Sequence, residues 1–65
     1  MNLIEKYYKY AGGEKPSITK SEEIIFDIID DLTDRRGLRQ EWEDIDDEVK
    51  EEIIKTWIDL VDKKI

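Results

Sequence analysis

Three arginines and one tryptophan form the first group of side chains whose types and spacing suit ligand chemistry. Arg35 and Arg36 come directly before Gly37, and Arg39 and Trp42 follow it. A planar guanidinium group binds carboxylates and phosphates through paired hydrogen bonds better than an ammonium group does. The group therefore predicts either an anion or nucleotide site, which a partner protein could also use, or an internal clamp. In the clamp the arginines would pair with the acidic start of the last helix and lock the turn around Gly37.

A dense run of carboxylates forms the second candidate site. Residues 41–52 contain eight acidic side chains and a single lysine. This surface suits a partner protein with a basic surface, and it could imitate the phosphates of a nucleic acid. It would also serve simply to start a helix and to keep a small domain soluble. The acidic residues are Glu41, Glu43, Asp44, Asp46, Asp47, Glu48, Glu51 and Glu52.

The composition argues against enzymatic functions. The chain has no cysteine and no histidine, so it lacks thiol chemistry, thiolate and imidazole metal ligands, and the commonest general base. No glycine-rich loop prepares a phosphate or oxyanion site, and a domain of 65 residues rarely encloses a cleft. We therefore expect no enzyme activity, no metal site and no cofactor.

The charge is unevenly distributed along the chain. The first twenty residues carry four lysines against two glutamates, a net charge of +2. Since the whole chain has a net charge of −7, the remaining residues carry −9. A chain this acidic repels phosphate backbones, and we expect no direct binding of nucleic acid. The first ten residues mix charges with apolar side chains, which fits neither a signal peptide nor a membrane span. The expected location is the cytoplasm.

Glycine and proline divide the chain into a short helix, a linker and a helical core. Apolar residues recur every three or four positions before Gly12, which is typical of a helix that ends at glycine. A proline then biases the chain away from helix. We expect a single domain over residues 1–65, with a helix in 1–13, a linker in 14–18 and a helical core in 19–65.

Three helices are expected within this core. Thr19 followed by Glu22 has the spacing of a capping box, which begins a helix. Gly37 is a natural end for that helix, and Asp46 is a natural N-cap for the last one. The three expected helices cover residues 20–36, 38–45 and 47–64.

The two long helices have more apolar surface than a one-sided surface helix needs. In the last helix two apolar stripes together span roughly 180°, against the ~100° of such a helix. Either each helix lies at the centre of a tight bundle, or one stripe contacts a second chain. A chain this short cannot easily cover both stripes. We therefore predict an all-α bundle of three to four helices that homodimerisation completes. The first stripe contains Val49, Ile53, Trp57 and Leu60, and the second, the predicted oligomer stripe, contains Ile54, Ile58, Val61 and Ile65.

The aromatic residues fit two roles each. Trp42 and Trp57 suit the core, and they also suit an interface, where tryptophan is a common anchor. Tyr7, Tyr8 and Tyr10 could contact a partner or cap the bundle.

The segment DLTDRRGLRQEWEDIDDEVKEEIIKTW carries a D-R-R-G-x-R-x-x-W-x-x-I-D pattern and a second tryptophan fifteen residues after the first. In this pattern it resembles short uncharacterised proteins of bacteriophages, prophages and bacterial genomes, over about residues 24–61. The resemblance implies a mobile-element setting, with the host cytoplasm as the location if a phage encodes the chain. It carries no catalytic or binding residues across.

Three functions remain open. The first is a small acidic protein–protein interaction module, homodimeric, that modulates or inhibits a host protein with a basic surface. The second is an inhibitor of a DNA- or RNA-handling protein that mimics nucleic acid. The third is a helical domain that binds a small anion or nucleotide through its arginines.

Overall fold

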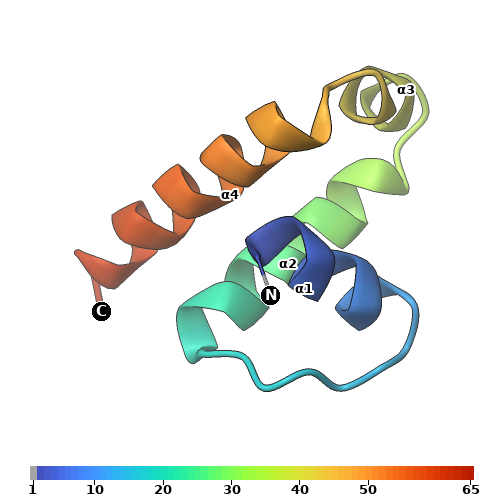
Figure 1. Cartoon of the computed structure of the whole chain (residues 1–65). Coiled ribbons are helices and arrows are strands. Elements are labelled where there is room, and N and C mark those ends of the chain that lie inside the picture. Colours follow the sequence, from blue (N-terminus) through green and yellow to red (C-terminus); the bar gives the residue numbers. More distant parts are fainter. Residues whose placement is uncertain (1) are drawn as a thin grey trace.

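The computed structural model describes residues 2–65, which form four helices joined by turns and one longer linker (Figure 1). No strand is present within these residues, so the all-α class is confirmed. None of the helices in this part of the chain is both long and apolar enough to cross a membrane. The helices are α1 (Leu3–Ala11), α2 (Lys20–Thr33), α3 (Leu38–Glu43) and α4 (Asp47–Asp62).

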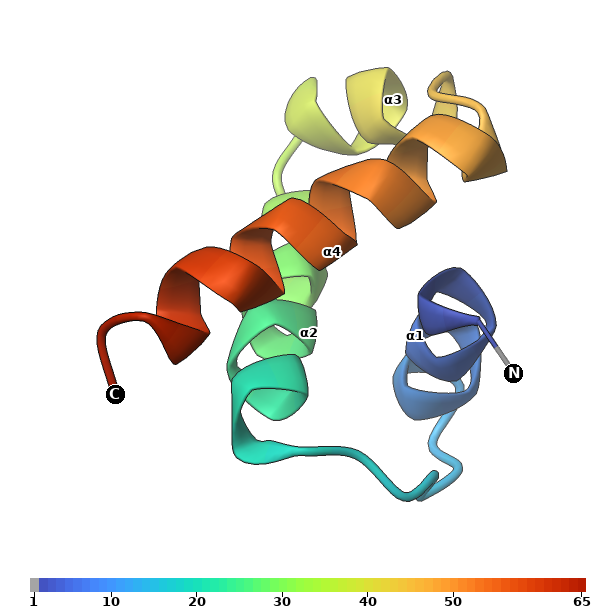
Figure 2. The same cartoon turned by 60° about the vertical axis from the view of Figure 1, so that its left-hand side comes forward.

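The two long helices form the centre of the molecule and run in opposite directions (Figure 1). The start of α2 and the end of α4 are joined by a hydrogen bond from the Ser21 hydroxyl to the Asp62 carboxylate. The short helix α3 crosses the other end, between α2 and α4 (Figure 1). Figure 2 shows α1 beside α2 and below the first half of α4, whereas the second half of α4 extends to the other side of α2.

The core lies where α1, α2 and α4 meet. Phe26, Ile29 and Ile54 are fully buried. The rings of Tyr7 and Tyr10 each lie 5.7 Å, between centroids, from the ring of Phe26, so α1 covers the face of α2 that carries Phe26. Aromatic pairs at this distance add to the stabilisation from buried area. The other buried apolar residues are Ile4, Tyr7, Ile25, Trp42 and Ile58.

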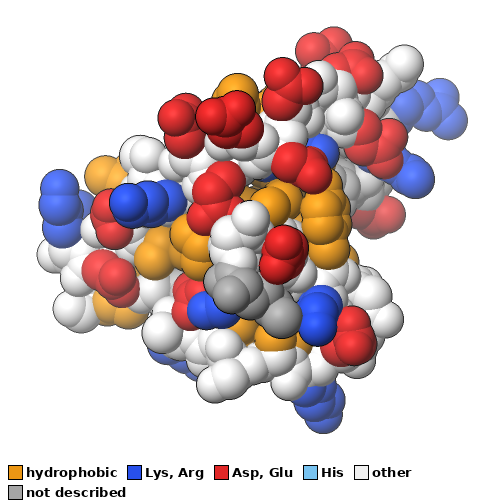
Figure 3. All heavy atoms as spheres, in the orientation of Figure 1, with side chains coloured by type: hydrophobic (Ala, Val, Ile, Leu, Met, Phe, Trp, Pro, Cys, Tyr) orange, Lys and Arg blue, Asp and Glu red, His pale blue; other side chains and the backbone are white. Residues whose placement is uncertain are grey.

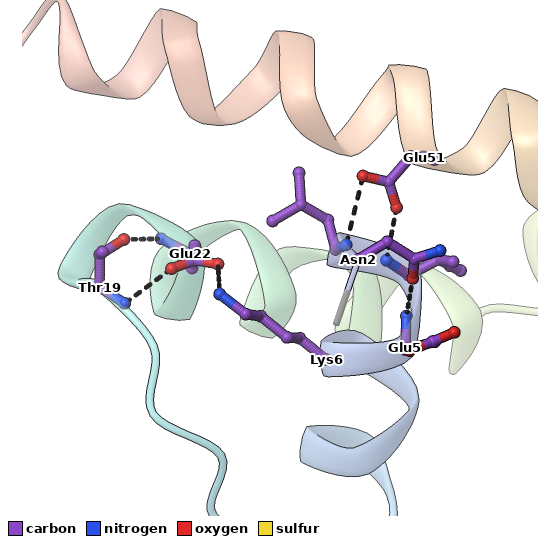
Figure 4. Close-up of polar contacts among 8 residues, drawn as sticks. Asn2, Glu5, Lys6, Thr19, Glu22 and Glu51 are labelled. Atoms are coloured by element: carbon purple, nitrogen blue, oxygen red, sulfur yellow. Dashed lines mark hydrogen bonds and ion pairs between the residues drawn. The ribbon is translucent and has the colours of Figure 1, made fainter.

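The predicted capping box begins α2 (Figure 4). The Thr19 hydroxyl accepts a hydrogen bond from the Glu22 N–H, and the Glu22 carboxylate accepts one from the Thr19 N–H. The Lys6 ammonium lies 3.2 Å from the same carboxylate and ties α1 to this turn. Burial alone would raise the pKa of Glu22, but the hydrogen bonds from Thr19 and Lys6 outweigh it, and the pKa is lowered.

Three helix ends differ from the prediction. The helix α3 ends at Glu43, two residues before the predicted end at Ile45. The helix α2 ends at Thr33 and not at Arg36, because the Asp34 N–H donates to the Asp31 carbonyl and the Arg35 N–H to the Leu32 carbonyl, which tightens the last turn. The helix α4 ends at Asp62, two residues early. Asp46 occupies the predicted N-cap position of α4, but its side chain makes no capping hydrogen bond.

Candidate functional site

The arginines lie in and beside the turn between α2 and α3. All three are exposed and border one surface hollow of about 470 Å³ around Gly37. Gly37 has φ +91°, a conformation that favours glycine. The pattern thus brings Arg35, Arg36 and Arg39 together. Binding of a small anion or nucleotide there stays a prediction.

The predicted clamp between the arginines and the start of the last helix is wrong. Within residues 2–65, no ion pair joins an arginine to α4. Arg35 pairs with Asp31 at 3.1 Å and Arg39 with Glu43 at 3.2 Å, both one turn away in sequence and both well exposed. Because α2 ends before Arg35 and Arg36, these side chains do not follow its apolar face toward α4. Exposed pairs of this kind contribute less than ~1 kcal/mol each.

The acidic residues of 41–52 form a solvated surface over α3 and the first half of α4 (Figure 3). Seven of the eight carboxylates are exposed, and only Glu51 is partly buried. Within residues 2–65, three have partners: Glu43 pairs with Arg39, Asp47 accepts from the Tyr8 hydroxyl, and Glu51 binds α1. In the described chain no hydrogen bond or ion pair engages the side chains of Glu41, Asp44, Asp46, Glu48 and Glu52.

Glu51 closes the start of α1 from a different helix (Figure 4). Its two carboxylate oxygens accept hydrogen bonds from the Ile4 N–H at 2.8 Å and the Leu3 N–H at 3.2 Å. Asn2 accepts from the Glu5 N–H and completes this N-terminus. The first N–H groups of a helix lack partners within it and carry a partial positive charge, so a carboxylate suits them. Glu51 is thus a structural residue.

Lys50 is a buried lysine on the inner face of α4. Its side chain is only 7% exposed. Its ammonium lies 5.6 Å from the ring centroid of Trp42 and 6.0 Å from that of Tyr8, and 3.8 Å from a carboxylate oxygen of Asp47. Aromatic faces stabilise a cation at this range.

Lys50 also borders a hollow of about 650 Å³ to which all four helices contribute side chains. Four carboxylates and two cations line this hollow, so its charge disfavours a small anion. Three of these carboxylates already have partners: Asp30 accepts from Tyr7, Asp31 pairs with Arg35, and Glu43 pairs with Arg39. We assign no ligand to this hollow.

The three tyrosines of α1 each donate a hydrogen bond to an aspartate of another helix. Tyr7 bonds to Asp30 at 3.1 Å, Tyr8 to Asp47 at 2.8 Å, and Tyr10 to Asp27. The tyrosines therefore attach α1 to the bundle, as expected if they cap the bundle and do not serve to contact a partner. Burial, with the nearby Asp30, raises the pKa of Tyr7 to about 12. The hydrogen bond to Asp27 is the main cause that raises the pKa of Tyr10 to about 12.

Alkaline titration of the folded protein should show this effect. Because folding favours the neutral phenols, their contribution to stability is present below pH 10 and is lost as the pH rises toward about 12. Ultraviolet absorbance of tyrosinate should develop near pH 12 for Tyr7 and Tyr10, and near pH 10 in urea. Asp27→Asn should lower the pKa of Tyr10 and leave that of Tyr7 unchanged. Ionisation of all three tyrosines near pH 10 in the folded protein would contradict these contacts.

An apolar groove lies between α2 and α4, on the side away from α1. We use this name for the hollow of about 260 Å³ lined by Ile25, Ile28, Trp57, Leu60 and Val61. All five side chains are apolar, yet Ile28 is 51% exposed and Leu60 52%. Trp57 is half-buried and stacks on the buried Trp42 at 6.4 Å between ring centroids. Trp42 thus belongs to the core, and Trp57 joins the core to the surface.

The predicted oligomer stripe is wrong at its centre. Ile54 and Ile58, the centre of the second stripe, are buried within their own chain and are not available to a second one. Of that stripe, Val61 is partly buried and Ile65 is exposed beyond the end of α4. The first stripe is the uncovered one, because α4 turns Ile54 and Ile58 toward α1 and α2.

The burial of Lys50 and the capping role of Glu51 were not predicted from the sequence, which placed Glu51 only in the acidic surface. Lys50 stands four residues before Ile54 and eight before Ile58, on the buried face of α4. That spacing was a signal for its burial, since a lysine on an apolar face can bury its stem. The capping role of Glu51 had no local signal, because α1 lies 47 residues earlier in the chain.

These features define a small helical domain with an exposed apolar groove and an exposed acidic surface. Comparison of the chain with protein-family models, with curated proteins and with solved structures gave no match.

Proposed function

We propose that the protein is a small acidic protein–protein interaction module that binds a second polypeptide chain through the apolar groove. The observation that carries this proposal is the exposure of Ile28 and Leu60 beside the half-buried Trp57, in a groove lined only by apolar side chains. A contiguous apolar surface on a small, highly charged domain is typical of an interaction site. Tryptophan is also a frequent anchor of such sites.

The acidic surface supports a partner with a basic surface. Five exposed carboxylates near the start of α4 have no partner within residues 2–65 and are free to attract positive charge. Opposite charges steer two proteins toward each other and raise the rate of association. In the mobile-element setting that the sequence pattern suggests, such a module would modulate or inhibit a host protein in the host cytoplasm. That the same acidic surface mimics a nucleic acid and so inhibits a DNA- or RNA-handling protein stays a prediction.

Photo-crosslinking in cells tests whether the groove binds protein. A photoreactive phenylalanine analogue at Leu60 should form adducts with another polypeptide, which mass spectrometry would identify. The same analogue at Lys55, which is exposed on the opposite side of α4, should form none and serves as the control. An absence of adducts at both positions would overturn the proposed function.

A further inference from the structure

The apolar groove continues along α4 as a stripe of four apolar side chains. Val49, Ile53, Trp57 and Val61 follow one another at intervals of four residues, which places them along one side of a helix. Val49 is 43% exposed, and the other three are partly buried. Leu60 borders the stripe, 52% exposed. The surface available to a partner is therefore longer than the groove itself.

The apolar positions of this stripe are symmetric about its centre in the sequence. Lys55 lies at its midpoint in the sequence, on the opposite side of the helix. Ile53 and Trp57 stand two residues to either side of Lys55, and Val49 and Val61 stand six residues to either side. Two copies of α4 laid antiparallel along this stripe would therefore place apolar side chains opposite apolar side chains.

The charged residues at the two ends of the stripe are complementary. Asp46 stands nine residues before Lys55 and Lys64 nine residues after it, just outside the two ends of α4. Asp46 makes no capping hydrogen bond, and neither residue forms an ion pair within residues 2–65. Two acidic residues follow Asp46, and Lys63 precedes Lys64. Figure 3 shows acidic side chains over the first half of α4, and both basic and acidic ones near its C-terminal end.

We propose that a second copy of this chain covers the apolar groove, with the two α4 helices antiparallel about a twofold axis. This inference rests on the proposed function, that the groove binds protein, and it names the occupant. Each Asp46 would then lie beside the partner copy's Lys64, and the contact occurs twice by symmetry. Antiparallel packing also places the positive end of each helix dipole beside the negative end of the other.

A parallel pair would place Asp46 beside Asp46 and Lys64 beside Lys64, which is unfavourable. The net charge of −7 on each copy opposes any self-association. The complementary helix ends are what lowers this repulsion where the copies touch. The charge pattern thus selects the antiparallel arrangement.

The mass in solution tests whether a second copy occupies the apolar groove and whether this side of α4 forms the contact. The wild-type protein should be a concentration-dependent dimer by light scattering. Leu60→Lys should raise the dimer dissociation constant at least about ten-fold, since it places a charge in an apolar contact. Lys55→Glu, which changes charge on the opposite side of α4, should leave that constant within about two-fold. Circular dichroism of each variant would confirm that the helices remain.

Cysteine pairs test the orientation, because the chain has no cysteine of its own. A disulfide requires Cα atoms within about 7 Å. In the antiparallel dimer two copies of residue 46 are separated by about 27 Å along the helix, at 1.5 Å per residue. Asp46→Cys mixed with Lys64→Cys should therefore form a disulfide-linked pair, whereas neither variant alone should.

The outcomes separate this inference from the proposed function. A wild-type monomer at all concentrations, or disulfides within the single variants but not the mixture, would overturn the antiparallel dimer. If Leu60 adducts in cells then contained only a different protein, the groove would still be an interaction site and the proposed function would stand. Dimerisation that Leu60→Lys leaves unchanged would also reject the inference, because another surface would then hold the copies together.

Discussion

Phe26→Ala is expected to unfold most of the protein under conditions in which the wild type is folded. Phe26 is fully buried and contacts two tyrosine rings of α1, so its removal leaves a cavity at the junction of α1, α2 and α4. Truncation of a buried phenylalanine costs about 3–5 kcal/mol. A core in a chain of this length rarely supplies more than about 3–5 kcal/mol in total.

Urea denaturation followed by circular dichroism would measure this loss. All variants should be compared at one protein concentration, because self-association adds to apparent stability. Ile65→Ala is the matched control, since Ile65 is 75% exposed and its truncation should change the free energy of unfolding by less than about 0.5 kcal/mol. A cost below about 1 kcal/mol for Phe26→Ala would be incompatible with the packing of α1 on α2.

Glu51→Ala is expected to destabilise the protein by about 1–3 kcal/mol, mainly by loosening α1. The substitution leaves the N–H groups of Leu3 and Ile4 without the acceptors that they have in the folded chain. Partly buried donors without a partner carry a cost of this size. Hydrogen exchange should show the change directly. Relative to the wild type, Glu51→Ala should speed the exchange of the first amides of α1 more than the exchange of the amides in α4.

The neighbouring glutamate provides a sharp control for Glu51. Glu52 is exposed, and its side chain has no partner within residues 2–65, so Glu52→Ala removes the same charge and should change stability by less than about 0.5 kcal/mol. Glu51→Gln keeps one acceptor oxygen and should fall between the two. Equal effects of Glu51→Ala and Glu52→Ala would show that net charge, and not the cap on α1, is responsible.

The helices were predictable because their signals are local. The capping box of Thr19 and Glu22, the end of α1 at Gly12 and the N-cap position of Asp46 all depend on residues within four positions of one another. The end of α2 was predicted three residues late. Arg35 and Arg36 are compatible with helix, and the sequence contained no strong signal that the turn starts at Asp34.

The choice between the two apolar stripes of α4 was not predictable from α4 alone. Ile54 and Val49 are similar side chains at equivalent spacing, yet one is fully buried and the other is 43% exposed. The difference arises from where α1 and α2 pack against α4, which is a property of the whole chain. The arginines show the same limit: their grouping was evident from the sequence, but their partners depended on where α2 ends.

The burial of Lys50 gives the protein an internal reporter of its own motions. An amine-reactive reagent needs access to the ammonium nitrogen, and this one is shielded between the rings of Tyr8 and Trp42. The exposed lysines Lys55, Lys63 and Lys64 would be modified at once. Lys50 would be modified only when α1, α3 and α4 separate, so its rate of acylation measures how often the junction of these helices opens.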